Sequence, residues 1–284
     1  MSPRRARTVP TSPLPGAPRS AVVTGGGRGI GEAIAAELVR RGYRVLVTDV
    51  DSTAAAATAE RIGAAGGAGY DVTDEHAAHD IAKQARALAP LGVWVNNAGV
   101  GFDGTLSELS SEHVRALVDV NVMGVVWGCR AAVAAFREQA AAGGPAGGDI
   151  GITASLSALG PVPGLSLYAA TKAAVLSLAA AQHSELRAEG IRVHAICPDG
   201  VNTELLRSMA DDGQAKALVR SGVLVAPEQV ARALADMFGT QRVYRTLPGW
   251  RGAIMRSTAL APGPMLRLEP LMRAWGRRRA RSLR

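Results

Sequence analysis

The stretch that decides the fold is Ala21-Val22-Val23-Thr24-Gly25-Gly26-Gly27-Arg28-Gly29-Ile30-Gly31. It begins with an apolar, β-branched run, which is typical of a buried strand. Residues 32–39 then place apolar side chains at helical spacing, so a glycine-rich turn joins this strand to a helix. Such a turn brings backbone N–H groups close to a ligand, and the helix N-terminus behind it favours an anion such as a pyrophosphate. The glycines do not follow the G-x-G-x-x-G spacing, so a tight turn without a ligand is the alternative.

Strand-like and helix-like segments alternate along the rest of the chain. The expected strands cover residues 20–23, 44–49, 69–73, 93–99, 149–154 and 191–197, and 242–247 is a candidate seventh. The expected helices cover residues 32–39, 53–62, 74–88, 111–142 and 166–189. This alternation predicts an α/β fold, a single doubly wound (Rossmann) domain in which helices cover both faces of a parallel sheet of six to seven strands. Ligands of such sheets bind at the carboxyl ends of the strands.

Length, charge and composition divide the chain into three parts. Residues 1–19 contain five prolines and four arginines without an acid, which predicts a disordered basic arm. Residues 20–240 form the expected catalytic domain, and residues 241–284, with eleven arginines and one acid, form a basic extension. The body between the two basic ends is mildly acidic, and no nucleic-acid module is recognisable, so specific nucleic-acid binding is not expected.

Cysteine usage and the termini bear on the compartment. The two cysteines, Cys129 and Cys197, lie in apolar stretches without a Cys/His pattern, so we expect buried thiols, no metal and a reducing compartment, the cytoplasm. We expect no secretory signal and no spanning helix. Apolar residues between Met265 and Trp275 alternate with arginines, which is compatible with a peripheral membrane contact; packing on the body or on a second subunit is the alternative.

Several residues at predicted strand ends are candidates for holding a dinucleotide. Asp49 is placed to accept the ribose hydroxyls of an adenosine, which favours NAD. Arg28 in the turn would instead pair with a 2′-phosphate, which favours NADP. Asp71 and Val72 are candidates for the adenine, although Asp71 is equally suited to a local turn. The backbone of residues 97–99 is placed to pass under the cofactor.

Tyr168 and Lys172 are the candidates for chemistry. They are four residues apart on a predicted helix, so both side chains point to one face. A tyrosine pKa near 10 is too high for a base at neutral pH, and a nearby ammonium lowers the pKa by favouring the phenolate. On solvated helices the same spacing is common and carries no function.

Four motifs together resemble the short-chain dehydrogenase/reductase family over about residues 20–240. The family's T-G-x-x-x-G-x-G pattern is matched by Thr24, Gly25, Gly29 and Gly31, and its N-N-A-G element by Asn96, Asn97, Ala98 and Gly99. Its Y-x-x-x-K motif is matched by Tyr168 and Lys172. Its active-site serine and asparagine correspond in position to Ser155 and Asn121. The resemblance implies hydride transfer between NAD(H), or alternatively NADP(H), and a secondary alcohol or ketone. A cofactor-holding scaffold without catalysis, recruited through the basic tail, is the alternative from another class.

The resemblance also implies a role for each residue. Tyr168 would be the general acid/base and Ser155 would stabilise the substrate oxygen. Lys172 would lower the pKa of Tyr168 and hold the nicotinamide ribose, and Asn121 would position a water in a proton relay. Ser157, two residues from the expected spacing, is a weaker candidate for the serine. The resemblance further implies that Thr24, Gly25, Arg28, Gly29, Ile30, Gly31, Asp49, Asp71, Val72, Asn97, Ala98, Gly99, Pro198, Val201 and Thr203 bind the cofactor.

The chain departs from the family pattern at two places. After the sixth strand it reads Pro198-Asp199-Gly200-Val201-Asn202-Thr203, with Asp199 where the family has glycine. The usual glycine-rich finish is also missing, and the basic extension replaces it. The segments expected around the substrate, residues 101–105, 156–165 and 204–225, are mostly apolar, which favours a hydrophobic substrate. Relatives of this kind usually form dimers or tetramers through two long helices, here 111–142 and 166–189.

Overall fold

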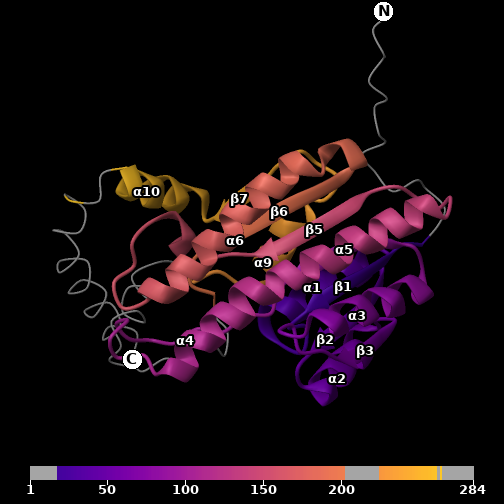
Figure 1. The fold of residues 1–284 in the computed structure, drawn as a ribbon, viewed down its shortest axis with the longest axis horizontal. Coiled ribbons are helices and arrows are strands. Elements are labelled where there is room, and N and C mark those ends of the chain that lie inside the picture. The colour runs from indigo at the N-terminus through magenta and orange to yellow at the C-terminus, as the bar shows by residue number, and fades with distance from the viewer. Residues whose placement is uncertain (1–17, 202–223, 261–262, 264–284) are drawn as a thin grey trace, which may run out of the picture.

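The computed structural model describes residues 18–201, 224–260 and 263. A parallel sheet of seven strands runs through the centre in the order β3-β2-β1-β4-β5-β6-β7 (Figure 1). The strands are β1 Ser20–Thr24, β2 Arg44–Asp49, β3 Gly66–Gly69, β4 Leu91–Asn96, β5 Gly148–Thr153, β6 Ile191–Pro198 and β7 Tyr244–Leu247. The predicted doubly wound α/β class is confirmed, including the seventh strand, and all six strand pairs are parallel.

Helices cover both faces of this sheet. They are α1 Gly29–Arg40, α2 Ser52–Ile62, α3 Glu75–Leu88, α4 Ser111–Val118, the π-turn η1 Asp119–Met123, α5 Gly124–Ala141, the 3₁₀ turns η2 Leu156–Leu159 and η3 Arg187–Glu189, α6 Ser166–Glu185, α9 Pro227–Ala235 and α10 Gly249–Leu260. Asp51, Asp74 and Ser110 start α2, α3 and α4 by accepting hydrogen bonds from backbone N–H groups of the first turn.

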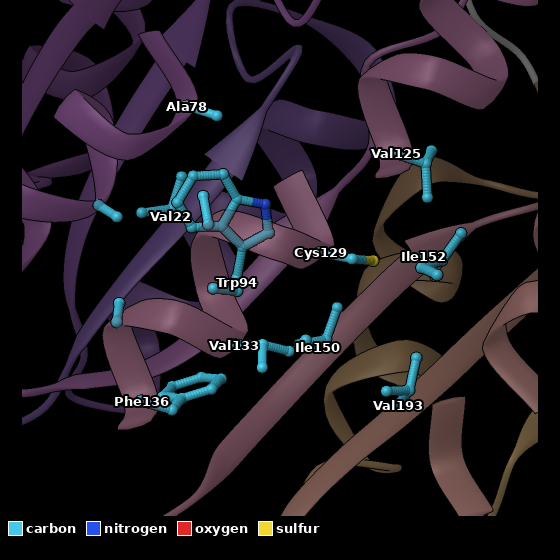
Figure 2. Packing of buried hydrophobic residues seen from close by; sticks show 14 of the residues in the cluster. Val22, Ala78, Trp94, Val125, Cys129, Val133, Phe136, Ile150, Ile152 and Val193 are labelled. Carbon is cyan, nitrogen blue, oxygen red and sulfur yellow. The ribbon is translucent and has the colours of Figure 1, made fainter. Parts of the chain in front are cut away.

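The alternation of side chains along the strands builds two cores. On one face, Val22, Trp94 and Ile150 pack under α3, α5 and α6, and Cys129 and Phe136 of α5 close this core (Figure 2). On the other face, the neighbouring strand residues, such as Val23 and Val95, pack under α1, α2 and α9. Since successive residues of a strand point to opposite faces, a strand buried on both sides is apolar over most of its length, as β1 is at Ala21, Val22 and Val23.

Three predicted elements differ in the structure. The third strand is Gly66–Gly69 rather than 69–73, and it was hidden because a glycine run carries no apolar pattern. A Cβ on Gly67 would lie 2.6 Å from the carbonyl oxygen of Ala55, so the strand passes directly against α2. The helix expected over 111–142 contains the π-turn η1, and the helix expected over 166–189 ends at Glu185, before η3.

The folded body also extends past both expected boundaries. Arg19, assigned from the sequence to the basic arm, donates hydrogen bonds to the carbonyl oxygens of Leu91 and Gly147. At the other end, β7 lies just beyond the boundary expected at residue 240, and it is hydrogen-bonded to β6 within the sheet. The rest of the arm, residues 1–17, and residues 264–284, for which the amphipathic membrane contact was expected, lie outside the described residues.

The helical segment Ser111–Ala141 is long and apolar enough to cross a membrane by length and composition. Half of its most apolar window is buried, and α5 contributes Cys129 and Phe136 to the core beneath it. A core helix of a folded domain meets the same criterion, so the segment is accounted for by packing.

Candidate active site

Gly25, Gly29 and Gly31, the three glycines of the motif at the β1–α1 turn, each have their own geometric reason. Gly25 and Gly29 have φ of 60° and 61°, in the left-handed region that side chains with a Cβ rarely adopt. A Cβ on Gly31 would lie 2.0 Å from the carbonyl oxygen of Gly25, so only glycine lets α1 begin this close to the turn. A Cβ on Gly25 would lie 2.8 Å from the Cα of Ala98, so the segment that follows β4 also passes directly against the turn.

Thr24 and Asn97 bind this turn to the neighbouring strand ends. The Thr24 hydroxyl accepts the N–H groups of Asn97 and Ala98, each at 3.0 Å. The Asn97 amide donates to the carbonyl oxygens of Thr24 and Gly25 at 3.0 and 3.1 Å. Its oxygen accepts from the hydroxyl of Thr153 at 3.1 Å. The ends of β1, β4 and β5 are therefore held in one fixed arrangement.

Asp49 faces the same turn from the end of β2. Its Oδ2 accepts the N–H of Gly27 at 3.0 Å, and the side chain is partly buried. Arg28 is the exposed N-cap residue of α1, and Ile30 packs against the core on that face. Both candidates for selecting between NAD and NADP thus lie at the turn, and the Asp49 carboxylate accepts a hydrogen bond from it.

Asp71 and Val72 lie beyond the end of β3. Asp71 is exposed, and its Oδ1 accepts from the backbone N–H and the hydroxyl of Thr73 at 2.9 and 2.8 Å. This is the local turn that the sequence left as the alternative. Val72 is 8% exposed and belongs to the core, where a Cβ on Gly124 would lie 2.8 Å from its Cγ2.

Asn121 lies in the π-turn η1, completely buried. Its Oδ1 accepts the N–H of Val100, and its Nδ2 donates to the carbonyl oxygen of Val100, both at 2.9 Å. The Nδ2 also donates to the hydroxyl of Thr171 at 3.2 Å. A Cβ on Gly99 would lie 3.0 Å from Asn121 Oδ1 and 3.3 Å from the Nζ of Lys172. The extra residue of the π-turn therefore carries Asn121 to the segment after β4, next to the Lys172 ammonium.

Lys172 and Tyr168 lie on the same face of α6, as predicted. Lys172 is 4% exposed, its Nζ donates to the carbonyl oxygen of Thr153 at 3.0 Å, and it lies 5.8 Å from the centre of the Tyr168 ring. Burial lowers the pKa of Lys172 to about 8. Burial also raises the pKa of Tyr168 above its usual 10, and hydrogen bonding with Ser155 opposes that rise. The expectation of a lowered tyrosine pKa is therefore wrong for the protein by itself, because desolvation dominates.

Ser155 follows β5 and is the N-cap residue of η2. Its Oγ accepts the N–H of Ser157 at 3.2 Å, and the two hydroxyls are 2.9 Å apart. Ser155 is the serine that lowers the pKa of Tyr168, whereas Ser157 contacts the site through Ser155. The structure thus brings Ser155, Tyr168, Lys172 and Asn121 together from three segments: the start of η2, helix α6 and the π-turn η1.

The segment after β6 differs most from expectation. Pro198 ends β6, and Val201, 7% exposed, bridges to Val225. Asp199 forms an ion pair with Arg251 of α10 at 2.8 Å. Sequence reasoning noted Asp199 as a departure but missed Arg251, since nothing in the sequence connects two residues on separate elements. Thr203 lies outside the described residues.

An open groove of about 600 Å³ adjoins the site. It is apolar and is lined by Ser157, Ala158, Leu159, Gly160, Pro161, Val162, Pro163, Ser166, Ala169, Ala170, Ala173 and Ala259. Part of the expected substrate segment 156–165 therefore lines this groove. Ser155 and Tyr168 do not line the groove, but their chain neighbours Ser157 and Ala169 do. The expected segment 101–105 is described but does not line this groove.

Comparison with known proteins agrees with this geometry. A sequence model of the short chain dehydrogenase family matches residues 19–214. The chain is 34% identical over 189 residues to the probable oxidoreductase EphD of Mycobacterium tuberculosis, covering 65% of this chain but 31%, less than a third, of that protein. It is 30% identical over 230 residues to the 3-oxoacyl-[acyl-carrier-protein] reductase FabG of Escherichia coli, covering 80% of this chain and 92% of that one.

A solved structure is similar over nearly its whole length. The 3-ketoacyl-(acyl-carrier-protein) reductase from Brucella melitensis, complexed with NADH, is 29% identical, with a TM-score of 0.74, over 82% of this chain and 98% of that chain. The family match covers more than half of the present chain, and it includes the turn, Asn121, Ser155, Tyr168 and Lys172. The chain therefore belongs to the short-chain dehydrogenase/reductase family of oxidoreductases.

Proposed function

We propose that this chain interconverts a secondary alcohol and a ketone with NAD(H) as cofactor. The observation that carries the proposal is the convergence of Ser155, Tyr168 and Lys172 at the carboxyl ends of β5 and β6. Lys172 is a buried amine, and its Nζ donates a hydrogen bond to the carbonyl oxygen of Thr153. A buried ammonium with unused donor capacity is suited to hold a ribose hydroxyl.

The β1–α1 turn fits a dinucleotide. Only glycine is compatible with the close contacts of residues 25 and 31, so a ligand can approach the backbone there. When bound, the nicotinamide supplies or accepts the hydride. The protein's part is to position the substrate carbon, to hold its oxygen and to move one proton.

Tyr168 is the proposed acid/base. For ketone reduction, its hydroxyl gives a proton to the substrate oxygen, and for alcohol oxidation its phenolate takes the proton back. The raised pKa of Tyr168 in the protein alone favours the protonated form, which is the form that reduction needs. Ser155 donates to the same oxygen as charge develops on it. Lys172 and Asn121, both next to Gly99, would pass the replacement proton from solvent through a water.

The proposed cofactor preference depends on Asp49. A carboxylate fixed at the turn accepts ribose hydroxyls and repels a 2′-phosphate, which favours NAD. The exposed Arg28 supports NADP as the alternative, since a guanidinium pairs well with phosphate. We propose a hydrophobic substrate because the groove next to Ser155 is apolar. The relative named as a 3-oxoacyl reductase is compatible with a ketone on an apolar chain.

A parallel screen tests the proposal. Alcohols and ketones of increasing apolar size are incubated with NAD(H) or NADP(H), and the absorbance of the reduced nicotinamide is followed. We expect turnover with at least one apolar secondary alcohol or ketone, faster with NAD(H). Binding of NADH without turnover of any substrate, together with unchanged NADH binding in Tyr168→Phe, would support the scaffold alternative instead.

A further inference from the structure

Helix α10 is joined to the segment after β6 by a largely buried ion pair. Arg251 Nε lies 2.8 Å from Asp199 Oδ2, with the side chains 17% and 8% exposed. Asp199 stands directly after Pro198, where the family pattern has a glycine. A carboxylate buried to this extent requires a cationic partner, and α10 supplies it.

Further close contacts hold α10 against its neighbours, on one side near Asp199 and β7 and on the other near Gly160. The N–H of Asp199 donates to the carbonyl oxygen of Leu247, immediately before α10. A Cβ on Gly252 would lie 2.2 Å from the hydroxyl of Thr246. A Cβ on Gly160 would lie 2.5 Å from the hydroxyl of Thr258. Helix α10 lies beyond β7 (Figure 1) and packs against β7 and against η2, which follows Ser155, while Arg251 joins it to Asp199 after β6.

We propose that Arg251 is a positioning residue that, through Asp199, fixes the Pro198–Val201 segment for the nicotinamide end of the cofactor. The inference rests on the proposed function, because only a dinucleotide bound across the strand ends brings its nicotinamide to this segment. The adenosine end would lie at Asp49, on β2. Four strand spacings separate β2 from β6, which is about 19 Å. Loss of the ion pair should therefore weaken one end of the cofactor's binding and leave the other unchanged.

Calorimetric titration with two probes separates the two ends. NADH carries the nicotinamide, and ADP-ribose lacks it. In Arg251→Met, which keeps most of the apolar stem, we expect NADH affinity to fall about tenfold and ADP-ribose affinity to stay within about twofold. Arg251→Lys should recover part of the NADH affinity. Arg256→Met is the matched control, because Arg256 lies on the same helix but over the ring of Tyr244, at 4.5 Å.

A second variant separates positioning from folding. Arg251→Met leaves Asp199 buried without this partner, which lowers the melting temperature by itself. In the double variant Asp199→Asn/Arg251→Met, we expect the melting temperature to recover while NADH affinity stays low. Recovery of both together, or an unchanged ratio of NADH to ADP-ribose affinity in Arg251→Met, would overturn the inference. A wild-type protein that binds neither probe would refute the proposed function itself.

Discussion

Lys172 Nζ donates a hydrogen bond to the carbonyl oxygen of Thr153, and this bond ties the centre of α6 to the last residue of β5. The Thr153 hydroxyl in turn donates to Asn97, which holds the glycine-rich turn. The proposed proton-transfer residues and the proposed cofactor turn are therefore parts of one hydrogen-bonded unit. Neither Thr153 contact is visible in the sequence.

Replacing Tyr168 by phenylalanine removes the proposed acid/base with almost no change of shape. We expect turnover to fall by at least about a hundredfold, the lower end of what general acid–base catalysis contributes. NADH affinity, measured by fluorescence titration, should change by less than about twofold, since Lys172 and the turn remain. A variant that keeps more than a tenth of the activity would assign the proton transfer to another group.

Lys172→Met tests whether the buried ammonium serves function at the expense of stability. The pKa of Lys172 is lowered to about 8 in the folded protein, below the value near 10.5 of the unfolded chain. The unfolded chain therefore binds more protons between pH 8 and 10.5, and the stability contribution of this group rises with pH over that window. Lys172→Met should remove this rise, should not lower the melting temperature at pH 7, and should abolish turnover. Melting curves from pH 7 to 10 measure it, and a lower melting temperature at pH 7 would mean that the amine is structural.

Asp49→Asn should change the choice between NAD and NADP. The substitution keeps an oxygen for the N–H of Gly27 and removes the negative charge that repels a 2′-phosphate. We expect the ratio of kcat/KM for NAD to that for NADP to fall by about ten- to a hundredfold, which corresponds to about 1.4 to 2.8 kcal/mol. Asp71→Asn is the control, because Asp71 bonds its own turn at Thr73, and its ratio should stay near that of the wild type. Equal effects of both substitutions would contradict the assignment.

Gly31→Ala should destabilise the protein through steric conflict. The added methyl group would meet the carbonyl oxygen of Gly25 at 2.0 Å, and overpacking of this kind costs about 1–3 kcal/mol. Gly249→Ala is the control, since nothing lies within 4 Å of its added Cβ. Urea unfolding followed by circular dichroism compares the two. An unchanged midpoint for Gly31→Ala would show that α1 shifts freely away from the turn.

Asp149→Asn should weaken the edge of the sheet remote from the proposed site. Burial raises the pKa of Asp149, but hydrogen bonds from His194 and Arg192 offset it, so the pKa lies below its usual value. The carboxylate therefore contributes stability above about pH 4 that is lost as the pH falls through its folded-state pKa. We expect Asp149→Asn to cost about 3 kcal/mol at pH 7 and to flatten the acid limb of the stability profile. Asp80→Asn is the control, because Asp80 lies on the surface. If burial causes the effect at Asp149, Asp80→Asn should leave the free energy of unfolding at pH 7 and the acid limb of the stability profile unchanged.

The sequence predicted the elements whose pattern is periodic and missed those whose pattern is not. The runs around Val22 and Val193 are mostly apolar because both faces of these strands are covered, and the sequence predicted both strands. The sequence misplaced strand β3 because its glycines, which allow α2 to pack directly against the strand, give no apolar pattern. The π-turn at Asn121 lies inside the single helix that the sequence predicted over 111–142, because this turn is held by the hydrogen bonds between Asn121 and Val100 and not by local propensity.

The candidate site shows the same division between local and distant information. Four residues apart on one helix, Tyr168 and Lys172 share a face because of helical geometry alone. Only the structure shows that the pKa of Tyr168 is raised, because the burial that raises it depends on what packs around the ring.

The sequence by itself determined the order of strands and helices, the doubly wound class and the glycine-rich turn, because each depends on residues close together in the chain. Only the tertiary structure decided that Thr153 receives the Lys172 ammonium and that Arg251 neutralises Asp199. Both contacts join segments whose distance is set by sheet order and helix packing. Burial makes such pairs strong and shifts their pKa values, and burial is produced only when the whole sheet and its covering helices have assembled.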